Sequence, residues 1–277
     1  MRKVALAIVA AGFATPVFAA DLPLKAVAAP VVAYNWTGCY LGLSAGVSKG
    51  HTDGFVTTSG TRLPENGAPL VVNPGINATG GFDSNLGAIG GGFVGCNYQF
   101  SNRFVVGIEG DYSLTQPLAG SKILGASTVT AMGFGNINDF WSIQMTDLAT
   151  IRGRLGYLAT DNLLIYATGG VAFGKFETYE TITTNPSPRE SWTQQQWRTG
   201  WTAGVGTEYA VANSGWSVRG EFLYTEFSRF NTFTNIPATG IPGSDTFTNM
   251  SVNFHDYTGR VGIAYKFGGP AAVVAKY

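Results

Sequence analysis

Apolar and aromatic residues alternate with glycine, polar or charged residues in eight separate segments of the chain. In the third segment, Phe104, Val106 and Ile108 share one face, and Glu109 and Asp111 share the other. A period of two is the period of a β-strand, so each segment predicts a strand with one apolar and one polar face. The expected strands are residues 38–47, 88–100, 104–114, 144–158, 163–176, 197–210, 216–227 and 256–267.

The connections between these segments alternate strictly in length. Short connections span residues 101–103, 159–162 and 211–215, and long ones span residues 48–87, 115–143, 177–196 and 228–255. Tight turns at one end and long loops at the other are typical of an outer-membrane barrel. The alternative is a secreted lipocalin-like or jelly-roll barrel, whose aromatic face would point inward. We therefore predict an all-β fold: an eight-stranded antiparallel transmembrane β-barrel with up-and-down topology and four long external loops.

The N-terminus has the features of a cleavable export signal. Arg2 and Lys3 precede an apolar run that is too short to span a bilayer, and small residues follow as far as Ala20. We expect cleavage after Ala19, with cleavage after Ala20 as the alternative. The expected organisation is a signal peptide at 1–19, a periplasmic lead-in at 20–35 and a barrel domain at 36–277. Both ends of the barrel chain are then periplasmic, in the cell outer membrane of a Gram-negative bacterium.

The composition agrees with a barrel in the outer membrane. The chain has 38 glycines, 6 tryptophans, 12 tyrosines and 18 phenylalanines, whereas only 12% of its residues are charged. Such residues suit strands with an apolar outer face, which makes outer-membrane lipid an expected partner. The 17 basic and 17 acidic residues balance, so there is no basic surface for nucleic acid.

The polar faces of the expected strands must point into the lumen, since a barrel of about eight strands has an interior just wide enough for side chains. Glu109 and Asp111 can meet Arg152 and Arg154 across neighbouring strands. We interpret the inward charges as a paired network that plugs the lumen, because an unpaired buried charge costs several kcal/mol. The alternative is that they line an ion-conducting pore. The inward charged residues are Glu109, Asp111, Arg152, Arg154, Arg198, Glu208, Arg219, Glu221, Asp256, Arg260 and Lys266.

Aromatic residues gather near the expected periplasmic ends of the strands. They predict a girdle at the membrane interface, although strand packing alone would also favour aromatic residues there. The residues are Trp36, Tyr40, Tyr98, Phe100, Phe104, Trp216, Tyr265 and Phe267.

The two cysteines fit a disulfide between the first two expected strands. If the two strands pair antiparallel so that the numbers of opposed residues sum to 135, Val47 faces Ala88 and Cys39 faces Cys96. Both cysteines then lie on the outward face. We predict a Cys39–Cys96 disulfide near the periplasmic rim, because bridges persist in an oxidising compartment. Two free thiols facing lipid are the alternative.

The remaining candidate residues indicate no cofactor, metal or catalytic centre. No ligand spacing connects the two histidines, His51 and His255, so no metal site is expected. The rival class is a membrane-embedded enzyme that uses His255 with Asp256, and with Ser228 or Ser251 nearby. Adjacent strand residues point to opposite faces, however, and His51 falls in an expected loop, so no enzymatic activity is predicted.

Four stretches of the chain resemble the small outer-membrane immunogenic protein or porin family of alphaproteobacteria, part of the OmpA-like eight-stranded barrel group. The order and spacing of the stretches make the resemblance specific. They are Asn35–Gly42, Val105–Asp111, Arg152–Tyr157 followed by Leu164–Gly170, and Arg260–Gly268.

The resemblance implies an abundant surface protein that supports envelope integrity, with porin activity often named. It also implies insertion by the barrel-assembly machinery, which usually recognises a C-terminal aromatic residue. Here ten residues follow Phe267, so either Phe267 or Tyr277 serves, and Pro270 disfavours a continuous strand to the end. The expected external loops contain no ligand motif, and a host or surface ligand bound through them stays an open alternative.

Overall fold

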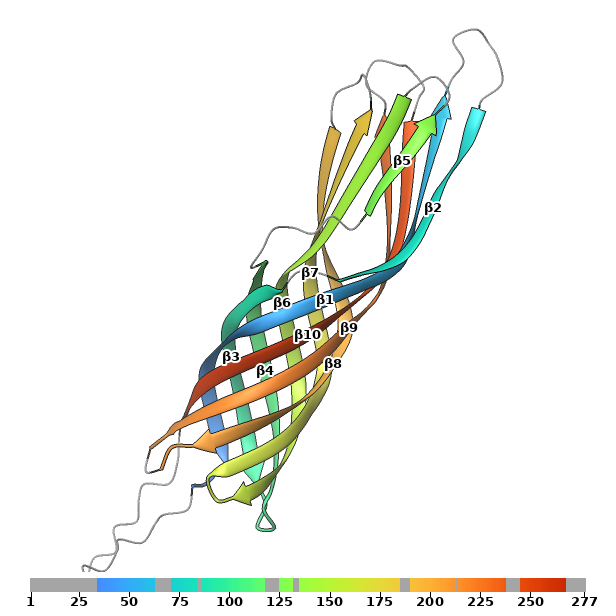
Figure 1. Cartoon of the computed structure of the whole chain (residues 1–277). Helices are drawn as coiled ribbons and strands as arrows, with labels where there is room; N and C mark the ends of the chain where they lie inside the picture. Colours follow the sequence, from blue (N-terminus) through green and yellow to red (C-terminus); the bar gives the residue numbers. More distant parts are fainter. Residues whose placement is uncertain are drawn as a thin grey trace, which may run out of the picture. The chain divides into compact units, whose positions relative to one another are not determined.

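The computed structural model describes residues 34–62, 71–83, 86–117, 125–131, 135–184, 190–212, 214–237 and 245–267. Their regular structure consists of strands (Figure 1). Among these residues, no helix is long and apolar enough to cross a membrane. The ten strands within the described ranges are β1 (Gly38–Arg62), β2 (Val71–Asp83), β3 (Gly87–Gln99), β4 (Phe104–Pro117), β5 (Gly125–Ala131), β6 (Gly135–Thr160), β7 (Leu163–Thr184), β8 (Glu190–Ala210), β9 (Trp216–Pro237) and β10 (Asp245–Lys266).

Three sequence-based expectations concern residues outside these ranges. They are the signal peptide with its cleavage after Ala19, the lead-in up to residue 33, and the role of residues 268–277 after the last strand.

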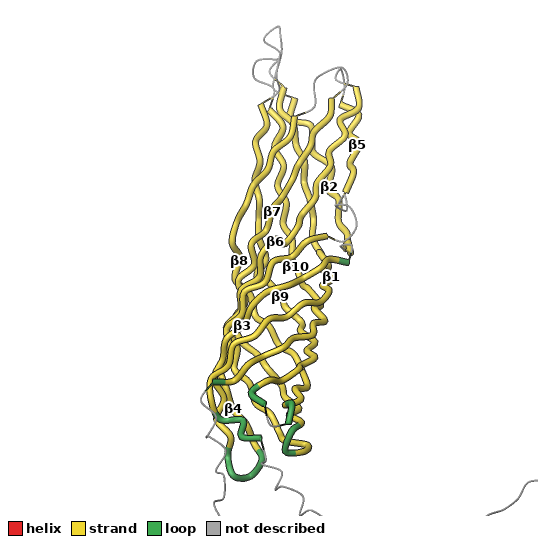
Figure 2. Tube along the Cα trace, turned by 90° about the vertical axis from the view of Figure 1, so that its left-hand side faces the viewer, coloured by secondary structure: helices red, strands yellow, loops and turns green. Residues whose placement is uncertain are grey.

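Eight of the described strands close into a ring (Figure 2). Around the ring the order is β1, β3, β4, β6, β7, β8, β9 and β10, with antiparallel neighbours, and β10 returns to pair with β1. The β1–β10 seam runs from Tyr40 opposite Lys266 to Thr61 opposite Asp245. Closure gives each strand a partner on both sides, which backbone groups require inside a bilayer. The predicted eight-stranded all-β barrel is confirmed.

The short connections lie at one rim, the turn end, and the strands extend further than expected toward the other rim, the loop end. Residues 100–103 join β3 to β4, and residues 161–162 join β6 to β7. At the loop end, β1 continues to Arg62, and β10 already begins at Asp245. The sequence-based prediction therefore assigned to the long loops residues that belong to strands. Two additional strands, β2 and β5, also lie within the predicted loops and pair with β1 and β6.

The physical reason for this correction is backbone pairing. The Thr- and Asn-rich segments near the loop end alternate apolar and polar residues only over short stretches, such as Val252 and Phe254, so their period-two signal is weak. A neighbouring strand still offers partners for every backbone N–H and C=O group, whatever the side chains are. Strand pairing thus continues where the hydrophobic pattern stops.

Exposure alternates along the strands and gives the barrel an apolar outside and a polar inside. On β4, Ile108 is 60% exposed and its neighbour Glu109 only 1%; on β6, Leu155 is 58% exposed and Arg154 only 5%. Exposed leucine, isoleucine, valine and aromatic side chains occupy the outer face of strands around the ring. Such a surface fits lipid rather than water.

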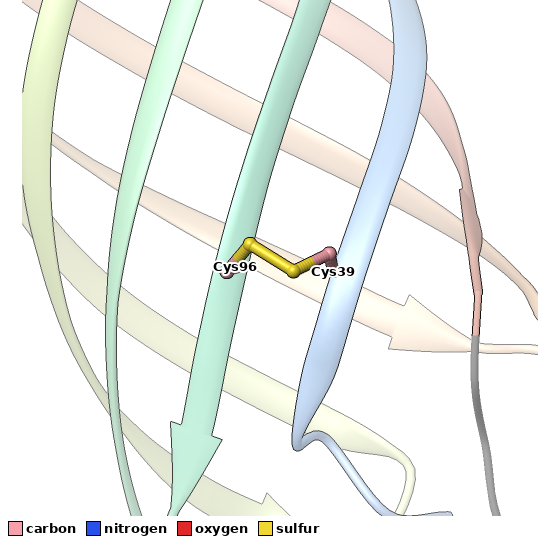
Figure 3. The surroundings of a disulfide bond; sticks show 2 residues. All are labelled: Cys39 and Cys96. Atoms are coloured by element: carbon pink, nitrogen blue, oxygen red, sulfur yellow. A yellow bond between two sulfur atoms is a disulfide. The ribbon is translucent and has the colours of Figure 1, made fainter.

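A disulfide joins β1 to β3 on the outer face (Figure 3). Cys39 lies directly opposite Cys96, and Val47 lies opposite Ala88, which is the register expected from the sequence. The bond links residues 57 positions apart in the chain. It therefore ties the first strand of the ring to its neighbour near the turn end.

Candidate functional site

Eight charged side chains meet in the middle of the lumen, and we call them the charge cluster. All of them are buried, because they occupy inward positions of their strands. The cluster contains four acids and four bases, so its formal charges cancel. Its members are Glu109 and Asp111 on β4, Arg152 and Arg154 on β6, Glu208 on β8, Arg219 and Glu221 on β9, and Arg260 on β10.

Arg152 occupies the centre of the charge cluster. Its Nη2 lies 2.6 Å from Glu109 and 3.0 Å from Asp111, and its Nη1 lies 3.0 Å from Glu221. Its Nε donates to the hydroxyl of Thr150 at 3.0 Å, and that hydroxyl donates in turn to Asp111. One guanidinium thus bridges carboxylates from two strands, β4 and β9, that are not neighbours in the ring. Arginine suits this position because its donors are rigid and forked.

The other three arginines complete the pairing of the carboxylates. Arg219 lies 2.5 Å from Glu109, and Arg154 lies 2.7 Å from Glu208. Arg260 bridges Asp111 at 3.1 Å and Glu221 at 2.6 Å. The cluster therefore spans the lumen from β4 to β10 with charge-assisted hydrogen bonds, which are the strongest class in proteins.

Two tyrosines and a phenylalanine extend the charge cluster. The Tyr40 hydroxyl donates to Glu109 at 2.8 Å and accepts from Arg154 at 2.6 Å. The Tyr166 hydroxyl donates to Glu221 at 3.2 Å, while the Phe93 ring lies under the Arg219 guanidinium at 3.4 Å. The sequence-based reasoning missed these three residues in the lumen.

Lumen glycines make room for the two tyrosine rings. A Cβ atom on Gly206 would lie 2.5 Å from Cζ of Tyr166, and a Cβ atom on Gly95 would lie 2.5 Å from the Tyr40 hydroxyl. Any larger residue would push the ring away from its carboxylate. The close approach of ring and backbone explains glycine at these inward positions.

An apolar layer fills the lumen on the loop-end side of the charge cluster. The ring of Phe176 lies 5.0 Å from that of Phe227 and 4.9 Å from that of Phe254, measured between centroids. These rings come from three strands, β7, β9 and β10, and meet inside the barrel. The buried residues of this layer are Ile89, Met145, Leu148, Ala172, Phe176, Phe227, Val252 and Phe254.

A second apolar layer closes the turn-end side. Trp36 is only 2% exposed, and its indole N–H donates to the carbonyl of Asp161 in the β6–β7 turn at 3.2 Å. The backbone N–H of Trp36 donates to the Gln99 side chain at 2.8 Å. Burial, with Glu208 as a second cause, raises the pKa of neighbouring Tyr34 to about 12. The layer consists of Trp36, Val105, Leu158, Leu164, Tyr166 and Ala210.

Three of the eleven charged residues expected in one network lie elsewhere. Asp256 is 1% exposed and accepts from the Thr258 hydroxyl at 2.6 Å, four residues or roughly 13 Å along β10 from Arg260. Arg198 lies half-buried near the loop end and donates to Gln196 at 2.7 Å. Lys266 lies at the turn end and donates to the backbone carbonyl of Asn35. Alternation places a residue on a face, but its height in the barrel depends on the register.

The expected aromatic girdle also needs a correction. Tyr40 points into the lumen, because its strand neighbour Cys39 faces outward. Trp36 precedes the strand and is buried against the β6–β7 turn. The other six residues are exposed near the turn end, where Trp216 and Tyr265 lie 5.1 Å apart between ring centroids. They are Tyr98, Phe100, Phe104, Trp216, Tyr265 and Phe267.

The two histidines lie opposite each other on paired strands, although no metal-ligand spacing in the sequence connects them. His51 lies on β1 rather than in a loop, directly opposite His255 on β10. The candidate pair His255 and Asp256 is divided between faces, since Asp256 is buried in the lumen and His255 lies on the outer face. They therefore cannot act on one substrate atom.

Comparison with known proteins adds a family and several relatives. Residues 5–267 match the family model of the outer membrane protein β-barrel domain. The chain is 33% identical over 271 residues to 31 kDa outer-membrane immunogenic proteins of Brucella melitensis and Brucella suis, covering 96% of this chain and 100% of each relative. Among solved structures, the outer membrane protease OmpT from Escherichia coli is 11% identical with a TM-score of 0.41, covering 82% of this chain and 97% of the protease.

Proposed function

This chain belongs to the outer membrane protein β-barrel domain family, and from that premise we propose that it is a structural envelope protein whose lumen is closed to solutes. The observation that carries the proposal is the filling of the lumen. The neutral charge cluster lies between the two apolar layers. An ion entering the lumen would lose hydration water at the apolar side chains, and the carboxylates could not replace that water because they already bind arginines. Apolar constrictions exclude water and therefore ions.

The second part of the proposal concerns the cell surface. In this proposal the loop end faces the outside of the cell. At that end the strands are longer than the apolar pattern predicts. The Brucella relatives are named immunogenic proteins of the outer membrane. Surface presentation of the loop end is therefore part of the proposed role, with outer-membrane lipid as partner and assembly machinery needed during insertion. An antiserum against the purified barrel should bind intact cells that produce it.

The alternative function is that of a small porin, and conductance in planar lipid bilayers distinguishes the two. For the proposed structural role we expect no stable openings from protein whose folding is verified by a heat-dependent shift in gel mobility. Stable, large openings of the unmodified protein would overturn the closed lumen.

A charge variant shows whether any current passes through the lumen. In a porin, Arg260→Gln should change the preference for cations over anions, because Arg260 faces the lumen. Arg103→Gln, at an exposed position of the β3–β4 turn, should leave that preference unchanged. A leak around the protein would respond to neither substitution.

No enzymatic activity is part of the proposal. Its support is the separation of His255 and Asp256 on opposite faces of β10. Lipid A incubated with the reconstituted protein should remain intact, and turnover abolished by His255→Gln would contradict this part.

A further inference from the structure

Both histidines of the chain meet at the seam where the barrel closes. His51 on β1 is the register partner of His255 on β10, and their ring centroids are 4.8 Å apart. Asp53 lies two residues further along β1, on the same outer face, with its Oδ1 atom 3.1 Å from Nε2 of His51. One candidate ligand atom from each of the three residues lies within 4.8 Å of the others.

From this arrangement we propose that His51, Asp53 and His255 bind a divalent cation of the late first transition row, with Zn²⁺ as the representative ion. Imidazole nitrogen and carboxylate oxygen are established ligands of these cations. With metal–ligand bonds of about 2.0–2.1 Å, tetrahedral geometry requires ligand atoms roughly 3.3 Å apart. The side chains would have to rotate to reach this spacing, and the exposure of the His51 and Asp53 side chains, 30% and 54%, leaves them room to do so.

The strands surrounding the three residues bring charges of both signs to the site. Glu226 on β9 is the register partner of His255 and accepts from the Tyr224 hydroxyl at 3.2 Å, so a second carboxylate lies on the neighbouring strand. Lys49 lies two residues before His51 on the same face and opposes a cation. Arg229 on β9 is a second positive charge near the site, because its Nε donates to Asn253, the register partner of Asp53. The carboxylates of Asp53 and Glu226 balance the charges of Lys49 and Arg229. A carboxylate that does not bind the ion can still orient a metal-binding histidine by accepting a hydrogen bond from its other ring nitrogen.

The level of the site along the barrel makes it accessible from outside the cell. Tyr224 and Tyr257 lie next to His255, with ring centroids 5.9 Å from the imidazole, and Trp201 contacts Tyr224. Exposed tyrosine and tryptophan mark the interface between lipid and water. The site lies at the loop-end edge of these rings, where the outer face becomes polar.

The structural consequence is a second tie between strands of the ring. The disulfide joins β1 to β3 near the turn end, whereas a bound cation would join β1 to β10 in the loop-end half. These two strands are the first and last of the ring, so the cation would hold the closure itself. Bound metal should raise the stability of the folded barrel, since the ligands come together only in that state.

The test is a calorimetric titration of Zn²⁺ into the folded, full-length mature protein in detergent micelles, prepared without a histidine tag. We expect one saturable site per chain. His51→Gln and His255→Gln should each weaken binding by at least about tenfold, and Asp53→Asn should also weaken it. Asp161→Asn removes an exposed carboxylate at the turn end and should leave binding unchanged.

Two further measurements address geometry and folding. Co²⁺ should give the intense visible absorption of a four-coordinate site, and the double variant His51→Gln/His255→Gln should lack it. Zn²⁺ should raise the unfolding temperature of the unmodified protein, reversibly with a chelator, but not that of the double variant. The heat-dependent gel shift shows that the variants are folded. Absence of saturable binding, or equal binding by the folded double variant, would overturn the proposed site without affecting the closed-lumen proposal.

Discussion

Replacing Arg152 by methionine tests whether the charge cluster holds the barrel together. Arg152 contacts Glu109, Asp111 and Glu221 within 3.0 Å, and its side chain is fully buried. Methionine fills much of the same volume but leaves the cluster with four acids and three bases. Breaking a buried ion pair by removing one partner costs about 3–5 kcal/mol. The loss of stability should stay near that of a single pair although Arg152 has three contacts, because each of the three carboxylates still contacts another arginine.

The assay is denaturant unfolding of the barrel in lipid vesicles, followed by the fluorescence of its tryptophans. We expect Arg152→Met to lower the free energy of unfolding by about 3–5 kcal/mol. The matched control is Arg103→Met, which removes an arginine 3.8 Å from Asp161 where the side chains are 54% and 64% exposed. Exposed pairs of this kind contribute about 0–1 kcal/mol.

A charge-restoring variant separates electrostatics from packing. Asp111→Asn in the Arg152→Met background again balances the cluster and leaves Arg260 paired with Glu221. We expect the double variant to lose less stability than the two single variants together, with a coupling of about 0.5–3 kcal/mol. If Arg152→Met matches the Arg103→Met control, or if the two single losses simply add, the cluster is not an electrostatic unit.

Three further predictions use the same unfolding assay. Replacing Cys39 and Cys96 by alanine should remove about 4 kcal/mol, the chain-entropy value for a bridge across 57 residues, and an unchanged midpoint would contradict it. Phe176→Ala should cost about 3–5 kcal/mol because the ring is fully buried between two others; retained stability would show that the apolar layer collapses around the gap. Gly206→Val should displace the ring of Tyr166 and destabilise the barrel by about 1–3 kcal/mol, and a neutral effect would mean that the ring moves freely.

Many of the lumen residues could be predicted from the amino-acid sequence, because successive residues of a strand point to opposite faces. Once one residue of a strand is assigned to a face, its neighbours follow. Glu109 and Arg152 follow period-two alternation on adjacent strands, and the structure places them opposite each other. The same alternation, counted from Cys39, would have placed Tyr40 inside the barrel, so that residue was predictable and was missed. Trp36 was not, because it precedes the strand and its burial depends on the turn at Asp161.

The amino-acid sequence by itself determined the eight-stranded ring, the register of Cys39 with Cys96, and which charges face inward. These features follow from alternation and turn spacing, both of which act between chain neighbours or adjacent strands. Only the tertiary structure decided the height of each charge in the lumen and the pairing of His51 with His255, which lie near opposite ends of the chain. Closure of the ring brings its first and last strands together, and the register there depends on the stagger of all the strands between them.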